Sequence, residues 1–225
     1  MNDTFSKAEA LRFGWETLKA HLVFLAGLML LILGLNLLPE LGRWQTLEAA
    51  PLLALIWTLC GYLVQMATQM GLIRISLRLV DGRQPRYGEL FGDLPTFWRY
   101  VAGNLLFLLI ILGGLLLLVI PGIIWSIKYQ FAPFLIVDRN LGIKEAFQES
   151  AGITSGVKRD LFLFFLLVMG INLVGLLAFA IGLFFTLPAT MIAYTFVYRK
   201  LLDRKKKAEA AQGRTEVISP AHEIR

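Results

Sequence analysis

Long uncharged stretches alternate with short charged ones along the chain. Four stretches contain no Asp, Glu or Arg, and three of them also lack Lys; they cover residues 20–39, 49–73, 101–137 and 161–198. About 20 apolar residues in a helix cross the hydrocarbon core of a bilayer, so the first two stretches each fit one crossing. The pattern predicts an all-α protein, a polytopic transmembrane helical bundle, because helices satisfy their own backbone hydrogen bonds in lipid.

The third and fourth stretches, with 37 and 38 residues, are too long for single crossings. As straight helices they would measure about 55 Å, against a hydrocarbon core of about 30 Å. Ile120-Pro121-Gly122 and the segment 182–188 supply the proline and glycine that suit a chain reversal. We therefore expect about six spans, at residues 20–38, 51–73, 101–120, 121–137, 161–181 and 185–199. The alternative is four spans with kinked or re-entrant elements.

A short amphipathic segment precedes each pair of expected spans. Apolar and charged residues alternate with helical spacing near residues 5–18, 87–94 and 143–151, and the segments align on Glu9, Glu89 and Glu145. The span pairs also end alike, in Leu79-Val80-Asp81, Ile136-Val137-Asp138 and Leu201-Leu202-Asp203. This predicts one transmembrane helical domain, residues 1–203, built of three amphipathic-helix-plus-hairpin units at 5–81, 86–138 and 142–203. The alternative is that interfacial helices share this pattern without any internal duplication.

Composition and charge agree with a membrane protein. Hydrophobic residues make up 57% of the chain and charged residues 17%, against about 25% charged in soluble domains. The net charge of +6 would suggest nucleic-acid binding in a soluble protein, but here the basic residues flank apolar segments, so we expect no nucleic-acid partner. Of the 22 Lys and Arg residues, only Arg43 falls in an expected outer loop. The positive-inside rule therefore predicts that the N-terminus and the C-terminus are both cytoplasmic, and membrane lipids are the expected surroundings.

Residues 204–225 differ from the rest of the chain. They begin with Arg204-Lys205-Lys206-Lys207 and continue with polar and small residues, a composition typical of a disordered tail. We expect a basic, disordered cytoplasmic tail. Its basic cluster either attracts anionic lipid headgroups or only fixes the topology.

No motif for catalysis or for a cofactor is recognisable. The histidines are His21 and His222, and no pair of His, Cys, Asp or Glu has metal-ligand spacing on one helix. No Gly-rich phosphate loop or nucleophile elbow is present. We therefore expect no enzymatic activity, no cofactor and no metal.

Polar residues at membrane depth are more informative, because lipid makes them costly. Lys128 lies near the middle of the expected fourth span, and Gln65, Asn104 and Asn172 lie within other spans. We expect these four residues to form an intramembrane polar path. Lys128 would then line the path or bind an anionic headgroup. The alternative is that the fourth span is shifted and Lys128 extends to the interface.

Several motifs resemble one protein family. They are Ile120-Pro121-Gly122-Ile123-Ile124, then Ala132-Pro133-Phe134-Leu135-Ile136-Val137-Asp138, Glu145-Ala146-Phe147 with Ser150 and Thr154, Val197-Tyr198-Arg199-Lys200-Leu201, and Gly14-Trp15-Glu16. Together they resemble an uncharacterised bacterial integral membrane protein family that includes YciC-like proteins and the membrane domain of some glycerophosphodiester phosphodiesterases. The resemblance covers most of residues 5–203. It implies several transmembrane helices in the bacterial cytoplasmic membrane, and it implies no particular activity.

Two functions are consistent with this sequence. The first is a non-enzymatic envelope or lipid-organising scaffold protein, with lipids as its partners and protein partners that the sequence does not identify. The second is a small transporter or channel for a lipid or an anionic metabolite, in which Lys128 and the amide side chains line the route.

Overall fold

The computed structural model describes residues 5–48, 50–90, 92–177 and 181–218, and every regular element within these ranges is helical. This confirms the expected all-α class. In chain order the elements are α1 (Lys7–Ala20), α2 (Leu22–Thr46), α3 (Pro51–Val80), the 3-10 turn η1 (Tyr87–Leu90), α4 (Leu94–Leu117), α5 (Val119–Tyr129), α6 (Ala132–Arg139), α7 (Ile143–Ile153), α8 (Lys158–Leu177) and α9 (Ile181–Ile218).

Several of these helices indicate a membrane-spanning protein. Within the described residues, five segments are long and apolar enough to cross a membrane: Leu22–Thr46, Pro51–Val80, Leu94–Leu116, Ile120–Arg139 and Lys158–Leu177. The expected sixth span, residues 185–199, lies in α9, which is not among these five. Six crossings therefore stay a prediction.

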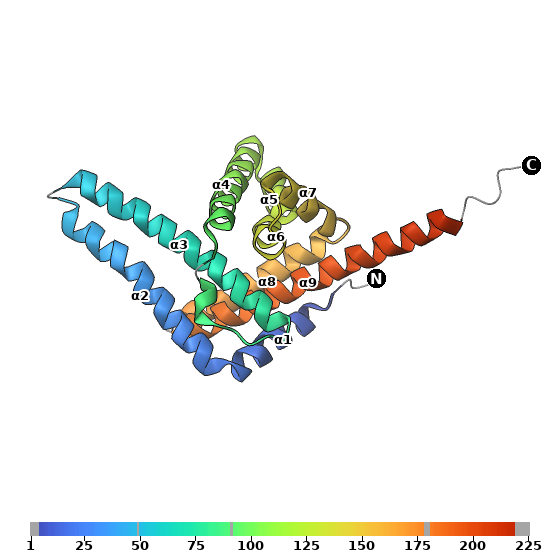
Figure 1. Ribbon diagram of the computed structural model, residues 1–225, viewed down its shortest axis with the longest axis horizontal. Helices are drawn as coiled ribbons and strands as arrows, with labels where there is room; N and C mark the ends of the chain where they lie inside the picture. The colour runs from blue at the N-terminus through green and yellow to red at the C-terminus, as the bar shows by residue number, and fades with distance from the viewer. Residues whose placement is uncertain (1–4, 49, 91, 178–180, 219–225) are drawn as a thin grey trace, which may run out of the picture.

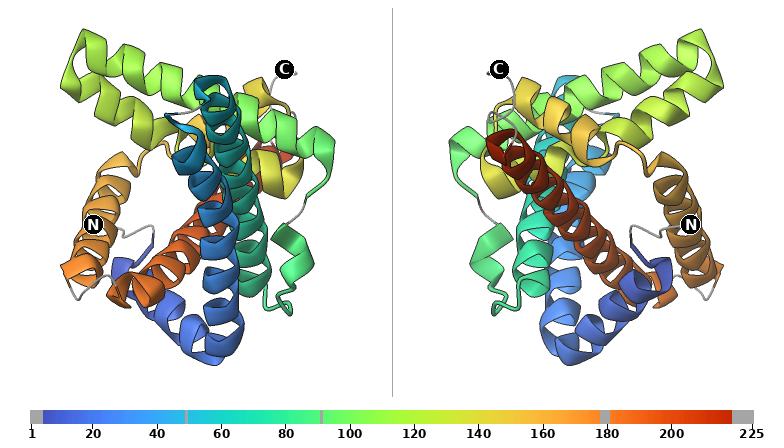
Figure 2. Two further views of the ribbon diagram at one scale, coloured as in Figure 1. Left: turned by 90° about the vertical axis from the view of Figure 1, so that its left-hand side faces the viewer. Right: turned by 90° about the vertical axis from the view of Figure 1, so that its right-hand side faces the viewer.

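The helices form three antiparallel hairpins, α2–α3, α4–α5 and α8–α9 (Figure 1). A short element precedes each one: α1, η1 and α7 respectively. The open ends of the hairpins converge on one region, and from there the hairpins point in different directions (Figure 2). This element order agrees with three similar units, although internal duplication itself stays a prediction.

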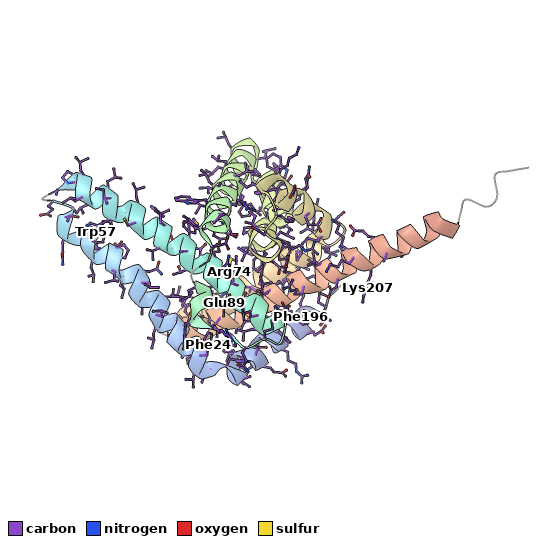
Figure 3. All side chains as sticks on the ribbon, in the orientation of Figure 1. Phe24, Trp57, Arg74, Glu89, Phe196 and Lys207 are labelled. Carbon is purple, nitrogen blue, oxygen red and sulfur yellow. The ribbon has the colours of Figure 1, made fainter. Side chains whose placement is uncertain are left out.

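The buried core lies where the open ends converge. Its fully buried side chains include Phe131 at the N-cap of α6, Leu135 and Ile136 in α6, and Tyr198 and Leu201 in α9. At the far ends of the hairpins, by contrast, large apolar side chains are exposed, among them Leu52, Leu116 and Leu177. Figure 3 labels Trp57 near the closed end of the α2–α3 hairpin and Arg74 and Glu89 where η1 lies beside α3. Exposed apolar surface on this scale is expected where lipid is the solvent.

Glycines allow close backbone contacts inside the α4–α5 hairpin and between α1 and α9. A Cβ atom on Gly14 would lie 2.3 Å from the carbonyl oxygen of Ala189, so α1 rests directly on the backbone of α9. A Cβ atom on Gly114 would lie 2.7 Å from Cα of Gly122, where α4 meets α5. Small residues at such contacts permit the close helix packing that replaces the hydrophobic effect in a membrane.

An ionic cluster joins the open ends of the hairpins. The Arg199 guanidinium in α9 donates to the Asp81 carboxylate from Nε at 2.9 Å and from Nη2 at 2.8 Å. It also donates to the Asp138 carboxylate from Nη1 at 2.7 Å and from Nη2 at 2.9 Å. The Tyr198 hydroxyl donates to the same Asp138 carboxylate at 2.8 Å. Asp81 caps the C-terminus of α3 and Asp138 lies in α6, so these four residues, which we call the Arg199 cluster, connect all three units.

A second carboxylate fixes the start of α4. Asp93 accepts hydrogen bonds from the Thr96 hydroxyl at 2.6 Å and the Thr96 N–H at 3.0 Å, and pairs with Arg74 of α3 at 2.9 Å. These bonds, the Thr96 hydroxyl first, hold the pKa of Asp93 well below its ordinary value. Asp93 is therefore a charged N-cap that also ties α4 to α3.

Three expected boundaries between spans are wrong. One is the expected reversal at residues 182–188, which lies within α9, with Pro188 inside the helix. The expected outer loop at residues 40–48 is helical as far as Thr46, with Pro39 inside α2. A lone proline removes one helical hydrogen bond, and the packing of α2 against α3 compensates for it. The chain reversal expected at Pro121 occurs at Leu118, whose backbone is extended. Pro121 therefore lies in the first helical turn of α5 and not between α4 and α5.

The second amphipathic segment and the tail also differ from expectation. The segment beginning at Tyr87 forms only the short turn η1, since Pro85, Gly88 and Pro95 prevent a longer helix. The expected disordered tail continues α9 as a helix to Ile218, past Lys207 (Figure 3). Its first residues are held by α7, since Lys205 pairs with Glu149 at 2.5 Å. Residues 219–225 lie outside the described ranges.

Replacing Arg199 with methionine should leave two partly buried aspartates without a counter-charge. The Arg199, Asp81 and Asp138 side chains are only 24%, 29% and 13% exposed. We expect a loss of about 2–4 kcal/mol, which corresponds to a fall of roughly 5–10 °C in the thermal midpoint measured in detergent.

Lys200→Met is the matched control for this substitution. Lys200 neighbours Arg199 in the chain, but its ion pair with Glu9 joins side chains that are 44% and 51% exposed, so its loss should cost under about 1 kcal/mol. Equal falls in the thermal midpoints of the two variants would show that the Arg199 cluster does not hold the hairpins together.

Candidate functional site

The expected fourth span, residues 121–137, is two helices instead of one. α5 ends at Tyr129, Gln130 and Phe131 leave the helix, and α6 begins at Ala132. Pro133 lacks an N–H group and clashes with the preceding turn, so a continuous helix would lose a hydrogen bond at this point. The proline instead occupies the first turn of α6, where it is favourable.

Helix α7 supplies the hydrogen bonds that the break removes. The Ser150 hydroxyl donates to the carbonyl of Lys128 at 3.0 Å and accepts from the N–H of Phe131 at 3.3 Å. The Thr154 hydroxyl also donates to the Lys128 carbonyl, at 3.2 Å. Ser150 and Thr154 are fully buried. Irregular backbone at membrane depth requires such protein partners, so the third amphipathic segment serves as a cap for a broken span.

A groove of about 600 Å³ lies beside the break, between α4, α5 and α7. Its walls are mainly apolar, and its polar lining includes two ammonium groups. The apolar lining includes Leu106, Ile110, Ile143 and Phe147, and the polar lining includes Lys128, Lys144 and Gln148.

The groove is lined by two cationic side chains, Lys128 and Lys144, that form no ion pair with any described residue. The Lys128 ammonium lies 5.0 Å from the centroid of the Tyr129 ring. The carboxylates of α7 have other partners: Glu145 accepts from the N–H of Gly142 at 3.2 Å, and Glu149 pairs with Lys205 at 2.5 Å. Two free cations beside an apolar wall suit an anion that carries an apolar chain.

Lys128 lies near the end of α5, beside α7. Its carbonyl contacts the amphipathic helix α7, and its side chain is half-buried beside that helix. The break in the helix begins two residues after Lys128, at Gln130. The depth of Lys128, near the middle of the span or near the interface, stays a prediction.

The other residues of the expected polar path lie elsewhere. Gln65 lines a separate cavity of about 390 Å³ between α2 and α3. The Asn104 amide donates to the Tyr100 carbonyl of its own helix at 2.9 Å, and the Asn172 amide donates to the Thr190 hydroxyl in α9 at 3.2 Å. Gln65 and Lys128 thus line different cavities, and a polar path through all four residues stays a prediction.

Two further cavities flank the convergent region. One, of about 460 Å³, lies between α4, α5, α8 and α9, with Phe107 and Phe165 in its lining and the Tyr194–Gln130 hydrogen bond at its edge. The other, also about 460 Å³, is an open cleft beside Asp81 and Arg199. In the part of the chain that the structure describes, no three metal-binding side chains come together.

The site residues that sequence reasoning missed are Ser150, Thr154 and Lys144. A signal for the first two was present, because hydroxyl residues four apart share a helix face. Hydroxyl groups on that face can cap a broken helix only if α7 packs against the break. Pro133 marks where the break occurs. Only the packing of α7 against α5 reveals that the two features meet.

Comparison with known proteins finds one similar family. Residues 100–205 match a family model described as "Protein of unknown function (DUF975)". The match extends from α4 into α9 and includes the whole groove, Asp138 and Arg199. Neither the search of curated proteins nor the search of solved structures gives a match. Over this part the chain is similar to an uncharacterised family, and the resemblance to YciC-like proteins stays a prediction.

Replacing Ser150 with alanine should destabilise the break, because the Phe131 N–H loses its buried acceptor. We expect a cost of about 1–3 kcal/mol, seen as a fall of several degrees in the thermal midpoint in detergent. Ser126→Ala is the matched control, since the Ser126 hydroxyl bonds only to the Ile123 carbonyl of its own helix. If both variants have the same thermal midpoint as the wild type, α7 is not the cap of the break.

Proposed function

We propose that the protein is a non-enzymatic scaffold that organises lipid in the bacterial cytoplasmic membrane, with both termini in the cytoplasm. The proposal rests on one observation: three apolar hairpins diverge from a single charged junction (Figures 1 and 2).

Diverging hairpins support a lipid-organising role. Their far ends expose large side chains such as Leu52 and Leu116 to the surroundings. Such surfaces in a membrane are covered by lipid or by other helices. Lipid between hairpins that are fixed at one end would be ordered by them, so the arrangement itself favours a local lipid environment.

The charge distribution supports the cytoplasmic placement of the junction. Arg74, Arg78, Arg139 and Arg199 all lie in the convergent region or beside it, in ion pairs with Asp or Glu. Near the opposite end of the first hairpin, Arg43 pairs with Glu40 of its own helix. Lys and Arg are retained on the cytoplasmic side, so the convergent ends would face the cytoplasm.

This orientation predicts different access to two positions in the full chain. In a Cys60→Ser background, Gln45→Cys near the closed end of the first hairpin should react with a membrane-impermeant thiol reagent on intact cells. Gln84→Cys, in the turn after α3, should react only after the membrane is permeabilised. Both side chains are exposed, so burial does not account for a difference. Labelling of Gln84→Cys on intact cells would contradict the orientation.

The scaffold role predicts lipid enrichment without transport. The protein should be reconstituted in vesicles of phosphatidylcholine and phosphatidylglycerol, and energy transfer from its tryptophans to fluorescent lipid analogues measured. We expect at least about twofold enrichment of phosphatidylglycerol over phosphatidylcholine near the protein, because basic groups at the membrane surface attract anionic lipid. A trapped anionic dye should remain inside the same vesicles.

The transporter alternative makes the opposite prediction. Protein-dependent release of the dye, or movement of the labelled lipid between leaflets, would overturn the scaffold proposal and favour a transport route. Protein-free vesicles of the same composition are the control for leakage.

A further inference from the structure

We propose that the groove between α4, α5 and α7 binds one anionic phospholipid, with its phosphate between Lys128 and Lys144 and an acyl chain along α4 and α5. This inference rests on the proposed lipid-organising function and names the lipid class and its site.

Charge is the first support. The groove presents two ammonium groups from different helices, and the carboxylates of α7 are bonded to other groups. Gln148 adds a neutral hydrogen-bond donor to the same lining. Phosphate carries the charge that complements this set, whereas a zwitterionic headgroup offers its own cation to the same place.

The backbone around Lys128 is held before any ligand binds. Its carbonyl accepts from both Ser150 and Thr154, so α5 and α7 are fixed relative to each other at this residue. Lys144 is the second residue of α7, the helix that carries Ser150 and has Thr154 as its C-cap. A site that is already assembled loses less conformational entropy on binding.

The length of α5 fits one acyl chain. From Lys128 back to the start of α5 at Val119 is nine residues, or about 14 Å at the helical rise. One leaflet of the hydrocarbon core is about 15 Å thick. Ile124 and Ile120 lie four and eight residues before Lys128 and are exposed, so an apolar strip leads from the groove toward the closed end of the hairpin.

The apolar wall argues for a lipid over a soluble anion. Leu106 and Ile110 of α4 and Phe147 of α7 line the same groove as the two lysines. A free phosphate would use only the cations, and it would leave this wall uncovered. A lipid uses both, which is the physical difference that the experiment measures.

The experiment uses the full chain in a neutral detergent. Binding of dioleoylphosphatidylglycerol, dioleoylphosphatidylcholine and inorganic phosphate would be followed by native mass spectrometry and by the shift in thermal midpoint. The test variant is Lys128→Gln with Lys144→Gln. The matched control is Lys206→Gln with Lys207→Gln, which removes two exposed lysines from the helical extension of α9.

We expect the wild type to bind phosphatidylglycerol more tightly than phosphatidylcholine, and phosphate at equal concentration to produce no shift. The Lys128→Gln and Lys144→Gln variant should lose about tenfold to thirtyfold in affinity for phosphatidylglycerol, since each lysine near a headgroup contributes roughly 1 kcal/mol. Its thermal midpoint without lipid should match that of the wild type. The Lys206→Gln and Lys207→Gln control should change affinity by no more than about twofold.

Three results would overturn the site. They are unchanged phosphatidylglycerol affinity in the Lys128 and Lys144 variant, an equal loss in the tail control, and a phosphate shift as large as that of the lipid, which would indicate a soluble-anion site.

The scaffold proposal has a separate outcome. If the groove variant keeps the wild-type affinity for phosphatidylglycerol and the wild type enriches this lipid in vesicles, the site is wrong and the scaffold remains. If the wild type binds one phosphatidylglycerol in the groove but enriches none around the hairpins, the site remains and the scaffold is wrong.

Discussion

The arrangement of the hairpins depends on one guanidinium that serves two carboxylates. Arg199 binds Asp81 and Asp138 with two hydrogen bonds each, and the two aspartates lie at the ends of different hairpin units. Partly buried carboxylates are costly without a counter-charge, so the cluster stabilises the position of each unit against the other two. The planar guanidinium of arginine donates two hydrogen bonds to each carboxylate at once, whereas a lysine ammonium has only three N–H donors.

A second constraint, the break before Pro133, connects the fold to the candidate site. Lipid offers no hydrogen bonds, so the carbonyl of Lys128 and the N–H of Phe131 need partners from the protein. Ser150 and Thr154 provide them, and this contact brings α7 against α5. The same packing places Lys128 and Lys144 along one groove with apolar walls. The positive groove is thus a consequence of how the broken span is capped.

Particular residues show why sequence reasoning succeeded at some positions and failed at others. The apolar runs located α2, α3, α4 and α8, because hydrophobic length is a local property. The shared endings at Asp81 and Asp138 were visible in the sequence, but their common partner, 118 residues from Asp81, was not. The break after Lys128 was not predicted, because residues 121–137 were read as one unbroken helix, whereas α5 ends at Tyr129 and α6 begins at Ala132.

The sequence by itself determined that the surroundings of this protein are lipid. Its long uncharged stretches predict helices that span a membrane, because every backbone group in lipid must be hydrogen-bonded within its own segment. It also determined which ends of the hairpins carry the charge. Only the tertiary structure decided that the basic tail continues α9, that Gln65 and Lys128 line different cavities, and that Lys144 lines the same groove as Lys128. Those features depend on contacts between residues far apart in the chain, and hydrophobic periodicity reports only on near neighbours.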